Sequence, residues 1–542
     1  MEFITKQVSS LQRVFLDGKC DLTEINGGSA LRGERFSYQI AYRSDEKFYA
    51  DIVVDSPIAQ YITVRSVGNV PSEMPVYKSD CDCYERTEAG LFPDVLYPID
   101  SDFVVKRYNY YSLWVAAELP KDIEPGDYGI TIKILRDNEE VSSNTFELKV
   151  LGAVLPDQEL IYTQWFHCDG IANYYNVPVF SEDFWSLTES FMKTAVHTGV
   201  NMILTPVFTP PLDTAVGGER LTVQLVDVRL INGKYSFGFE KFIRWVRLAK
   251  RCGFKFFEIS HLFTQWGAAF APKIVADVDG EQKQIFGWDT PAASKEYSDF
   301  LHAFLPELIK VIKSEKIEKN TFFHISDEPN DEQSASYAEA KKIVAPLLED
   351  FPIIDALSDY EYYESGLITH PIPCTTNIEA FIEKGFPHPW TYYCCGQGGK
   401  LSNRFFGMPL AVTRAIGVQL FKYDIEGFLQ WGYNFYNSQY SVRSIDPFSV
   451  TDADSAFPSG DAFTVYPYKN GAVESVRSEV FYEALQDMRA MTLLSDLIEK
   501  NRTVSIIEKE FGKITFTEFP RKTADIIKMR ELINRKIAEL QQ

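Results

Sequence analysis

Residues 321–330 read TFFHISDEPN, and the fold of this chain can be worked out from this stretch. A short run rich in apolar residues ends in two adjacent carboxylates, Asp327 and Glu328, and a proline follows them. An apolar run of this length, bounded by a chain-breaking residue, is typical of a buried strand. One Asp would be enough to make a turn, and two neighbouring carboxylates repel each other. The stretch therefore predicts a strand with a chemically unusual end.

Similar apolar runs recur throughout the second part of the chain and alternate with amphipathic stretches. This alternation indicates parallel βα units, and eight runs predict a closed (β/α)8 barrel of the TIM type. An open doubly wound sheet is the alternative, although the chain contains no glycine-rich phosphate-binding loop. The expected strands are 161–167, 200–206, 254–260, 321–326, 351–357, 390–395, 427–431 and 463–467.

Helical patterns occupy the intervals between these runs, and a hairpin insertion is expected at 221–237. The expected helices are 183–199, 239–253, 294–316, 331–350 and 475–500.

The first part of the chain has a different pattern, with short segments rich in β-branched and aromatic residues that are separated by turn residues. This pattern predicts an antiparallel β-sandwich with strands at 36–43, 48–54, 61–67, 110–120, 128–135 and 145–151. A chain of 542 residues is too long for a single core, so several domains are expected. We predict an all-β sandwich over 1–155, the α/β barrel over 156–500, and a small C-terminal appendage over 501–542.

The net charge of −22 bears on the partners of the protein. Such a surface repels phosphate backbones and anionic lipids, which argues against a nucleic-acid partner. No apolar stretch approaches the roughly 18 residues needed to cross a bilayer, so membrane insertion is not expected. A neutral or weakly charged substrate fits best, and the sequence does not indicate an oligomeric state.

The eight cysteines form neither a zinc-binding pattern nor a recognisable disulfide framework. Several lie in apolar runs, as buried thiols do, so we expect them to be reduced. The first residues, MEFITKQVSSLQRVFLDGKC, lack the basic start and apolar core of a signal peptide. This predicts a cytoplasmic location, although a protein whose leader had been removed would look the same.

Barrel enzymes carry their active sites at the carboxyl ends of the strands. Around Asp327 and Glu328, these ends carry carboxylates, indoles and phenols, a lining that suits the hydroxyls and apolar faces of sugars. A chain with 14% aromatic residues would also place some there by chance. The other residues at these ends are Trp165, His167, Thr205, Glu258, His261, Trp266, Asp359, Tyr360, Tyr393, Trp431, Asn434, Asp461 and Tyr466.

Glycoside cleavage needs a proton donor for the leaving oxygen and negative charge near the developing cation. Adjacent residues cannot easily flank one sugar ring at the usual separations, so Glu258 or Asp461 would have to complete a conventional pair. Alternatively, the 2-acetamido group of the sugar attacks the anomeric carbon, and Asp327 only holds that group while Glu328 donates the proton. A raised pKa would suit Glu328 for this role. The structural alternative is that Asp327 caps the next helix.

Several motifs resemble those of glycoside hydrolase family 123, the β-N-acetylgalactosaminidases. Their order along the chain is more specific than any one of them. The motifs are LWVAAELPKDIEPGDYGITI (113–132), HISDEP (324–329), GFLQWGYNFY (427–436), PSGDAFTVYP (458–467) and SVRSEVFYEALQD (475–487).

The resemblance implies a retaining exo-glycosidase that removes terminal β-linked N-acetylgalactosamine through an oxazoline intermediate, without metal or cofactor. Asp327 would then orient the acetamido group, and Glu328 would be the general acid and base. The remaining candidates for substrate binding are Trp165, His261, Tyr360, Tyr393, Trp431, Asn434 and Asp461.

Other classes of protein remain compatible with the sequence. A hydrolase of the same fold could act on a different sugar with a conventional carboxylate pair. A non-catalytic carbohydrate-binding protein or a structural scaffold would also fit, with the carboxylates of the DE pair serving as helix caps.

Overall fold

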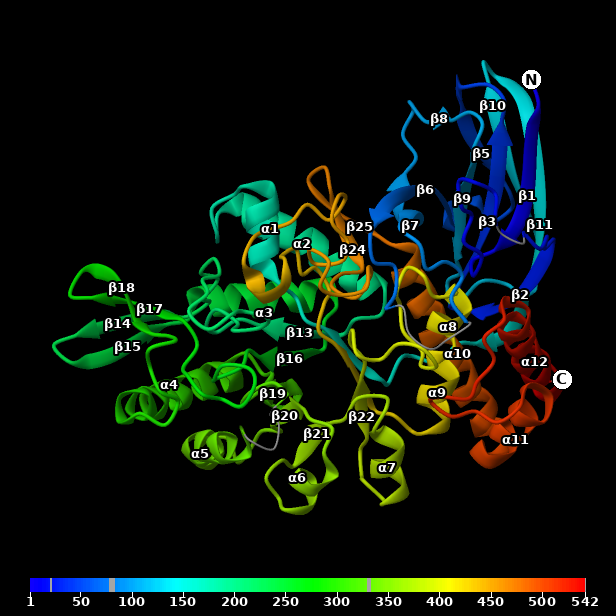
Figure 1. The fold of residues 1–542 in the computed structure, drawn as a ribbon. Helices are drawn as coiled ribbons and strands as arrows, with labels where there is room; N and C mark the ends of the chain where they lie inside the picture. The colour runs from blue at the N-terminus through cyan, green and yellow to red at the C-terminus, as the bar shows by residue number, and fades with distance from the viewer. Residues whose placement is uncertain (20–21, 78–82, 329–332, 542) are drawn as a thin grey trace.

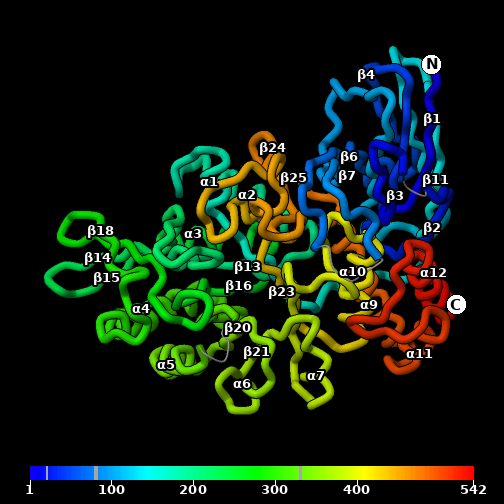
Figure 2. Tube along the Cα trace, in the orientation of Figure 1, coloured from blue at the N-terminus to red at the C-terminus, as the bar shows by residue number. Residues whose placement is uncertain are grey.

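The computed structural model describes residues 1–19, 22–77, 83–328 and 333–541. Figure 1 shows β-sheets built from the first part of the chain at one end, and a parallel sheet with its helices at the other. The tube in Figure 2 follows the chain from the blue N-terminal strands through the green and yellow helices to the red C-terminal helices. These last helices return to lie beside the N-terminal sheets.

Two sheets make up most of the N-terminal region, which is rich in β-structure as predicted. Alternate residues of β10, such as Ile130 and Ile132, are buried, and they share one core with Leu113 of the other sheet. One sheet has the order β1 (Phe3–Ser9), β3 (Arg35–Ser44), β9 (Tyr110–Glu118), β6 (Ile62–Ser72) and β7 (Gly90–Pro98). The other has the order β2 (Gly27–Arg32), β11 (Glu139–Val154), β10 (Gly126–Arg136) and β5 (Asp51–Asp55), and β4 (Phe48–Tyr49) pairs with β8 (Val104–Val105).

A half-barrel of six parallel strands forms the centre of the second part of the chain. Every residue of β13, MILT, is buried, as expected for a parallel strand that is covered on both faces. The order across this sheet is β19 (Thr321–Phe323), β16 (Phe256–Ile259), β13 (Met202–Thr205), β12 (Ile161–Gln164), β23 (Gly427–Gln430) and β22 (Trp390–Tyr392).

Two short strands, β20 (Ile354–Ala356) and β21 (His370–Ile372), pair in parallel with each other. Single parallel bridges connect this pair to the two outer strands of the half-barrel: Phe323 of β19 pairs with Ile353, and Tyr392 of β22 pairs with Cys374. Figure 1 shows β20 and β21 between β19 and β22.

The strand expected at 463–467 is not part of the parallel sheet, which corrects one prediction. Its residues contribute to β24 (Val465–Tyr468), which pairs antiparallel with β25 (Gly471–Glu474). An apolar run shows that a strand is buried but not which strand it pairs with. Conversely, β21 was missed because it has three residues, and one of them is proline. The expected hairpin insertion is confirmed as β14 (Asp227–Ile231) and β15 (Lys234–Gly238), which share a sheet with β17 (Ile274–Val278) and β18 (Glu281–Phe286).

The stretches predicted as helical at 183–199, 239–253, 294–316 and 331–350 correspond to α2, α3, α4 and α5, although residues 331 and 332 lie outside the described ranges. The shorter helices α1 and α6 to α9, which also lie between parallel strands, were not predicted. Ser181 accepts a hydrogen bond from the backbone of Phe184 and so caps α2, while Gly253 ends α3 in a left-handed conformation. The helices are α1 (Cys168–Tyr175), α2 (Glu182–His197), α3 (Glu240–Cys252), α4 (Lys295–Ser314), α5 (Ser334–Val344), α6 (Tyr360–Glu364), α7 (Ile378–Glu383), α8 (Leu410–Arg414), α9 (Ile416–Lys422), α10 (Val476–Ile498), α11 (Lys500–Phe511) and α12 (Thr523–Gln541).

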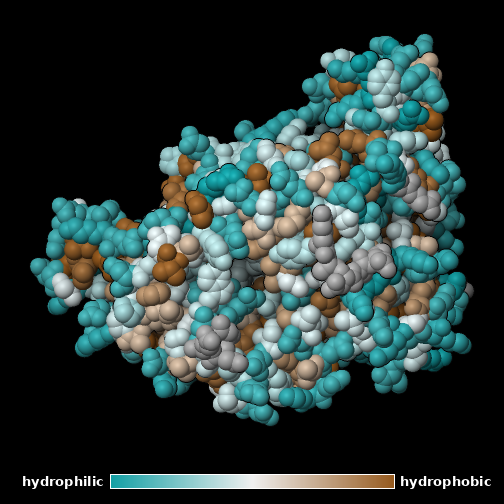
Figure 3. Space-filling view, viewed as in Figure 1, coloured by the Kyte–Doolittle hydropathy of each residue, from teal (hydrophilic) through white to brown (hydrophobic). Residues whose placement is uncertain are grey.

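No helix in the described ranges is long and apolar enough to span a bilayer. Figure 3 shows a mainly hydrophilic face with scattered apolar groups, in keeping with the high net charge. Cys83 takes part in a disulfide, so the expectation of eight reduced cysteines is wrong at this position. Spacing along the sequence did not reveal the disulfide because it does not determine which sulfurs meet in space.

The last helix, α12, packs against strands β2 and β11 of the N-terminal region. The Glu531 carboxylate accepts hydrogen bonds from the backbone N–H (2.9 Å) and the hydroxyl (2.6 Å) of Ser29. Arg530 forms a buried ion pair with Glu34 at 2.5 Å. The last helix of the chain therefore packs directly onto strands from its beginning.

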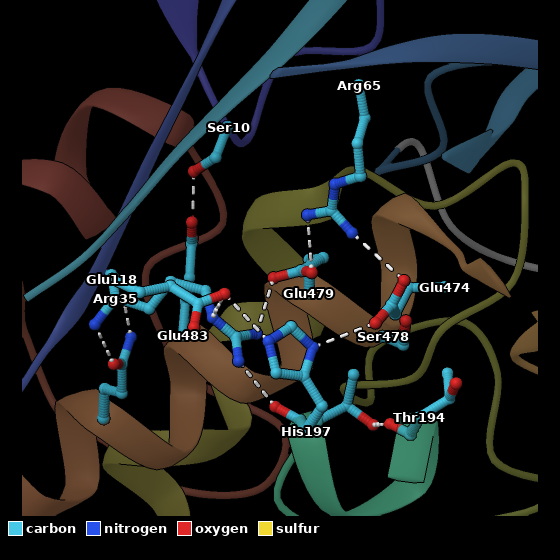
Figure 4. A network of polar contacts seen from close by, with 12 residues as sticks. Ser10, Arg35, Arg65, Glu118, Thr194, His197, Glu474, Ser478, Glu479 and Glu483 are labelled. Atoms are coloured by element: carbon cyan, nitrogen blue, oxygen red, sulfur yellow. Dashed lines mark hydrogen bonds and ion pairs between the residues drawn. The ribbon is translucent and has the colours of Figure 1, made fainter. Parts of the chain in front are cut away.

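A buried network of charges joins α10 to the N-terminal sheet (Figure 4). Glu479 lies 2.9 Å from Arg35 of β3 and 2.7 Å from Arg65 of β6. His197, at the end of α2, bonds Glu474 at 2.9 Å. Burial would raise the pKa of Glu479, but the charges of the two arginines and His197 lower it to about 2.

Glu479→Gln is expected to destabilise the protein by about 3–5 kcal/mol at pH 7, because the buried Arg35 and the half-buried Arg65 lose the carboxylate that they share. The folded-state pKa of Glu479 lies below its ordinary value of 4.5, so its contribution is complete above pH 4.5 and is lost as the pH falls toward about 2. Thermal unfolding at several pH values tests both points. As a control, Glu118→Gln removes a carboxylate that is 45% exposed and should cost about 1 kcal/mol or less. Equal losses in the two variants would contradict the prediction.

Candidate active site

A pocket of about 130 Å³ opens at the carboxyl ends of the parallel strands. Asp327 and Glu328 follow β19, Trp165 follows β12, and Trp431 follows β23. The complete lining is Trp165, Leu212, Asp213, Gln265, Trp266, Asp327, Glu328, Ala356, Tyr392, Cys394, Cys395, Leu429, Trp431 and Phe457. The pocket thus brings both predicted carboxylates together with three of the aromatic residues expected at the strand ends, Trp165, Trp266 and Trp431.

The backbone of the carboxylate pair is held by both neighbouring segments. The N–H of Trp266 donates to the carbonyl of Asp327 at 2.8 Å, and the N–H of Glu328 donates to the carbonyl of Ala356 at 3.1 Å. Glu328 has a φ of 41°, a left-handed conformation that is unfavourable for a residue with a side chain. Strain of this kind is typical of functional sites, where the surrounding structure holds a residue in place.

Tyr392 fixes the side chain of Glu328. Its hydroxyl donates to Oε1 of Glu328 at 2.5 Å. Burial and the adjacent Glu328 raise the pKa of Tyr392 well above its ordinary value, so the phenol keeps its proton and remains a donor. The Glu328 side chain is exposed at the mouth of the pocket, while Asp327 is half-buried.

The pKa of Asp327 is raised well above its ordinary value by burial and by the neighbouring Glu328. Asp355 and Asp213 add to this effect, and His324 opposes it. Burial also raises the pKa of Asp213 to about 6. Asp327 is the more deeply placed carboxyl of the pair. The pocket therefore favours the protonated form of Asp327.

A buried His324 lies between two carboxylates close to the pair. Its Nε2 lies 3.0 Å from Glu258 and its Nδ1 lies 3.3 Å from Asp355. Burial alone would lower the pKa of His324, but these two partners raise it to about 9. Asp355 also accepts the backbone N–H of Ile325 and the hydroxyl of Tyr337. Asp355 therefore holds His324 and Ile325, which connect β19 to the carboxylate pair.

Asp461 supports the pocket from behind Trp431. The indole N–H donates to Asp461 at 2.9 Å, and Gln430 donates to the same carboxyl at 3.2 Å. Asp461 is fully buried, which raises its pKa to about 6 against the opposing charge of Arg404. Asp461 therefore positions Trp431 and does not line the pocket.

Four of the other predicted site residues lie outside the pocket, which corrects their expected placement. His261 is buried against His324, with ring centres 4.3 Å apart. Asn434 is buried and bonds the backbone of His167. Tyr393 is buried against Phe428. Tyr360 lines an adjoining groove instead.

The phenol in the pocket is Tyr392 rather than Tyr393, because consecutive residues along a strand point in opposite directions. Asp213 and Gln265 were missed because they lie in loops, although the position of these loops after predicted strands was a usable signal. Gln265 accepts the backbone N–H of Asp213 at 2.5 Å and so ties the two loops together.

Two groups of side chains in the described residues have donor atoms close enough to hold a metal ion: His261, His324 and Asp355, and His197, Glu474 and Glu479. In the first group, both nitrogens of His324 already bond carboxylates. In the second, two arginines neutralise Glu479. These partners fit ion-pair networks.

The comparisons with known proteins agree with this geometry. Residues 165–494, more than half of the chain, match the family model described as glycoside hydrolase 123, catalytic domain. The protein is therefore a glycoside hydrolase. It belongs to family 123, which confirms the resemblance found in the sequence.

A solved family 123 glycoside hydrolase from Clostridium perfringens, whose structural analysis concerns glycolipid glycan hydrolysis, superposes with a TM-score of 0.71 at 15% identity. The match covers 99% of this chain and 97% of that one. A putative glycoside hydrolase from Bacteroides vulgatus is far less similar (TM-score 0.30, 12% identity, 78% of this chain and 76% of that one). No curated protein sequence matches the chain significantly.

Proposed function

We propose that this glycoside hydrolase removes terminal β-linked N-acetylgalactosamine from glycans by a retaining, substrate-assisted mechanism. The observation that carries the proposal is that Asp327 and Glu328, adjacent in sequence, line the same pocket. Glu258 and Asp461, the two partners considered for a conventional pair, have 0% exposure and lie outside the lining. A substrate that supplies its own nucleophile needs only one acid/base and one carboxylate beside the acetamido group.

In the first step, the acetamido oxygen attacks the anomeric carbon and the bond to the leaving oxygen breaks. Glu328, held through Oε1 by Tyr392, gives its proton to the leaving oxygen. Asp327 accepts the acetamido N–H and balances the positive charge of the cyclised intermediate. That developing charge favours the ionised form of Asp327, against the effect of burial. In the second step, Glu328 takes a proton from a water molecule. The water oxygen attacks the anomeric carbon and breaks its bond to the acetamido oxygen, which opens the oxazoline ring.

We also propose that the eight parallel strands close into one (β/α)8 barrel, with the single bridges at Phe323 and Tyr392 as the irregular part of the ring. An N-terminal sandwich over 1–155, the barrel over 156–500 and the final helices over 501–542 would be its units. One core cluster includes Trp114, Val480 and Ile533, so these units would form a single packed body.

Asp213 favours a second candidate function. This third carboxylate also lines the pocket. Asp213 and Glu328 could form a conventional pair that acts on a sugar without an acetamido group.

A set of 4-nitrophenyl glycosides separates these functions: β-N-acetylgalactosaminide, β-N-acetylglucosaminide, α-N-acetylgalactosaminide and β-galactoside. Hydrolysis of the first with at least about a thousandfold preference over the β-galactoside is expected, because the latter lacks the internal nucleophile. Comparable hydrolysis of the β-galactoside would favour the pair with Asp213. Absence of hydrolysis in the whole set would overturn the proposal.

A further inference from the structure

A second, larger depression adjoins the pocket on the side of Glu328. This groove of about 580 Å³ lies where the loop after β20 leads into α6, and α7 forms its other side. Figure 1 shows α6 and α7 next to each other beside β20 and β21. The lining includes Glu328, Asp359, Tyr360, Ala380, Phe381 and Tyr392.

The carboxylate pair gives the two depressions different roles. Glu328 and Tyr392 line both, whereas Asp327 lines only the pocket. In the proposed function, Glu328 delivers its proton to the oxygen between the cleaved sugar and the rest of the glycan. That oxygen must lie at the boundary of the two depressions. With the acetamido group on the side of Asp327, the leaving group can only extend into the groove.

The lining is chemically suited to a saccharide. Tyr360 and Phe381 supply aromatic surface, with ring centres 5.0 Å apart in an edge-to-face arrangement. Asp359 caps α6 by accepting the N–H of Glu361 at 2.9 Å, and this fixes Tyr360 at the first position of the helix. Aromatic faces pack against the apolar faces of sugar rings, and the polar lining residues can bond the hydroxyls.

The charges of the lining select against anions. Two carboxylates, those of Asp359 and Glu328, line the groove, and the described lining contains no lysine or arginine. The ammonium of Lys384 lies 3.9 Å from the centre of the Tyr360 ring but is not part of the lining. An acidic leaving group would therefore meet like charge.

We infer that this groove binds the leaving group as a neutral saccharide and that Tyr360 determines the preference for it. This inference rests on the proposed function of the pocket. It places Tyr360 against the sugar that is released rather than against the N-acetylgalactosamine residue.

The test compares a substrate that carries a saccharide leaving group with one that carries none. One is a disaccharide with β-linked N-acetylgalactosamine on galactose. The other is N-acetylgalactosamine oxazoline, which has lost its leaving group and leaves the groove empty. Tyr360→Ala should lower the ratio of kcat/KM for the disaccharide over the oxazoline by roughly tenfold, the effect of one aromatic contact. Tyr360→Phe keeps the ring and should restore the ratio to within about twofold of wild type.

A second variant keeps the test decisive if Tyr360→Ala does not fold. Ala380 is exposed on α7 and lines the groove, so Ala380→Trp fills it without disturbing the core. The same ratio should fall by tenfold or more. At low ionic strength, the wild-type protein should cleave a disaccharide that carries galacturonic acid in place of galactose several-fold more slowly than the galactose disaccharide.

The outcomes separate the inference from the function on which it rests. If the wild-type protein acts on neither the oxazoline nor the disaccharide, the proposed function fails, and the inference fails with it. If it acts on both and the variants change the two rates equally or not at all, only the groove assignment is wrong. Equal rates on the galactose and galacturonic acid substrates would overturn the preference for a neutral leaving group.

Discussion

Glu328→Gln is expected to lower kcat/KM for a β-N-acetylgalactosaminyl disaccharide by about 10³–10⁴-fold, and for the 4-nitrophenyl glycoside by only about 10-fold to 100-fold. Galactose is a poor leaving group and needs the proton of Glu328, whereas 4-nitrophenolate leaves with little assistance. Part of the loss remains for both substrates, because Glu328 also activates the water in the second step. Steady-state kinetics on the two substrates measure the difference.

The matched control is Glu361→Gln, an isosteric change at an exposed carboxylate on α6, and its rates should stay within about twofold of wild type. If Glu328→Gln slowed both substrates equally, Glu328 would not be the proton donor. A normal circular dichroism spectrum and melting temperature of each variant are needed, because Glu328 lies in a strained turn.

Asp327→Asn should damage both kinds of substrate by about 10³-fold or more, because stabilisation of the acetamido group is needed whatever the leaving group is. Asparagine keeps the shape of the side chain but cannot balance the charge of the cyclised intermediate. A loss confined to the disaccharide would contradict this role and would point to proton transfer instead.

The same variant should be more stable than wild type at neutral pH. The pKa of Asp327 is raised above its ordinary value of 3.8, so ionising this carboxyl destabilises the folded state as the pH rises. Asparagine removes that cost, and the melting temperature should rise by roughly 1–3 °C at pH 7 with no gain at pH 3. Asp299→Asn, at an exposed position on α4, serves as a control and should leave the melting temperature unchanged at both pH 7 and pH 3. A fall in melting temperature at pH 7 would contradict the raised pKa.

Much of the second part of the fold could be predicted because long helical patterns are unambiguous. The stretch 294–316, for example, contains all of α4 (Lys295–Ser314). Short strands were harder to predict, because a strand of only three residues, such as β21, shows almost no periodicity in the sequence. The run at 463–467 was placed in the parallel sheet because apolar character does not reveal the pairing partner.

The site was predictable where its signal is local. Asp327 and Glu328 are neighbours in the sequence, so one strand end brings both into the pocket. Tyr392 and Tyr393 differ by one position, and the sequence WTYYCC does not say which of them faces inward. The roles of buried groups such as Asp461 depend on partners that are distant in the sequence, in this case Trp431 and Arg404.

The position of α12 has a consequence for synthesis on the ribosome. Ser29 and Glu531, which bond each other, are 502 positions apart in the chain. During translation, the faces of β2 and β11 that α12 covers remain open until nearly all of the other described residues have been made. Contacts of such high sequence separation slow folding and leave strands exposed to wrong partners. The nascent N-terminal sheets should therefore depend on molecular chaperones until residues 523–541 emerge.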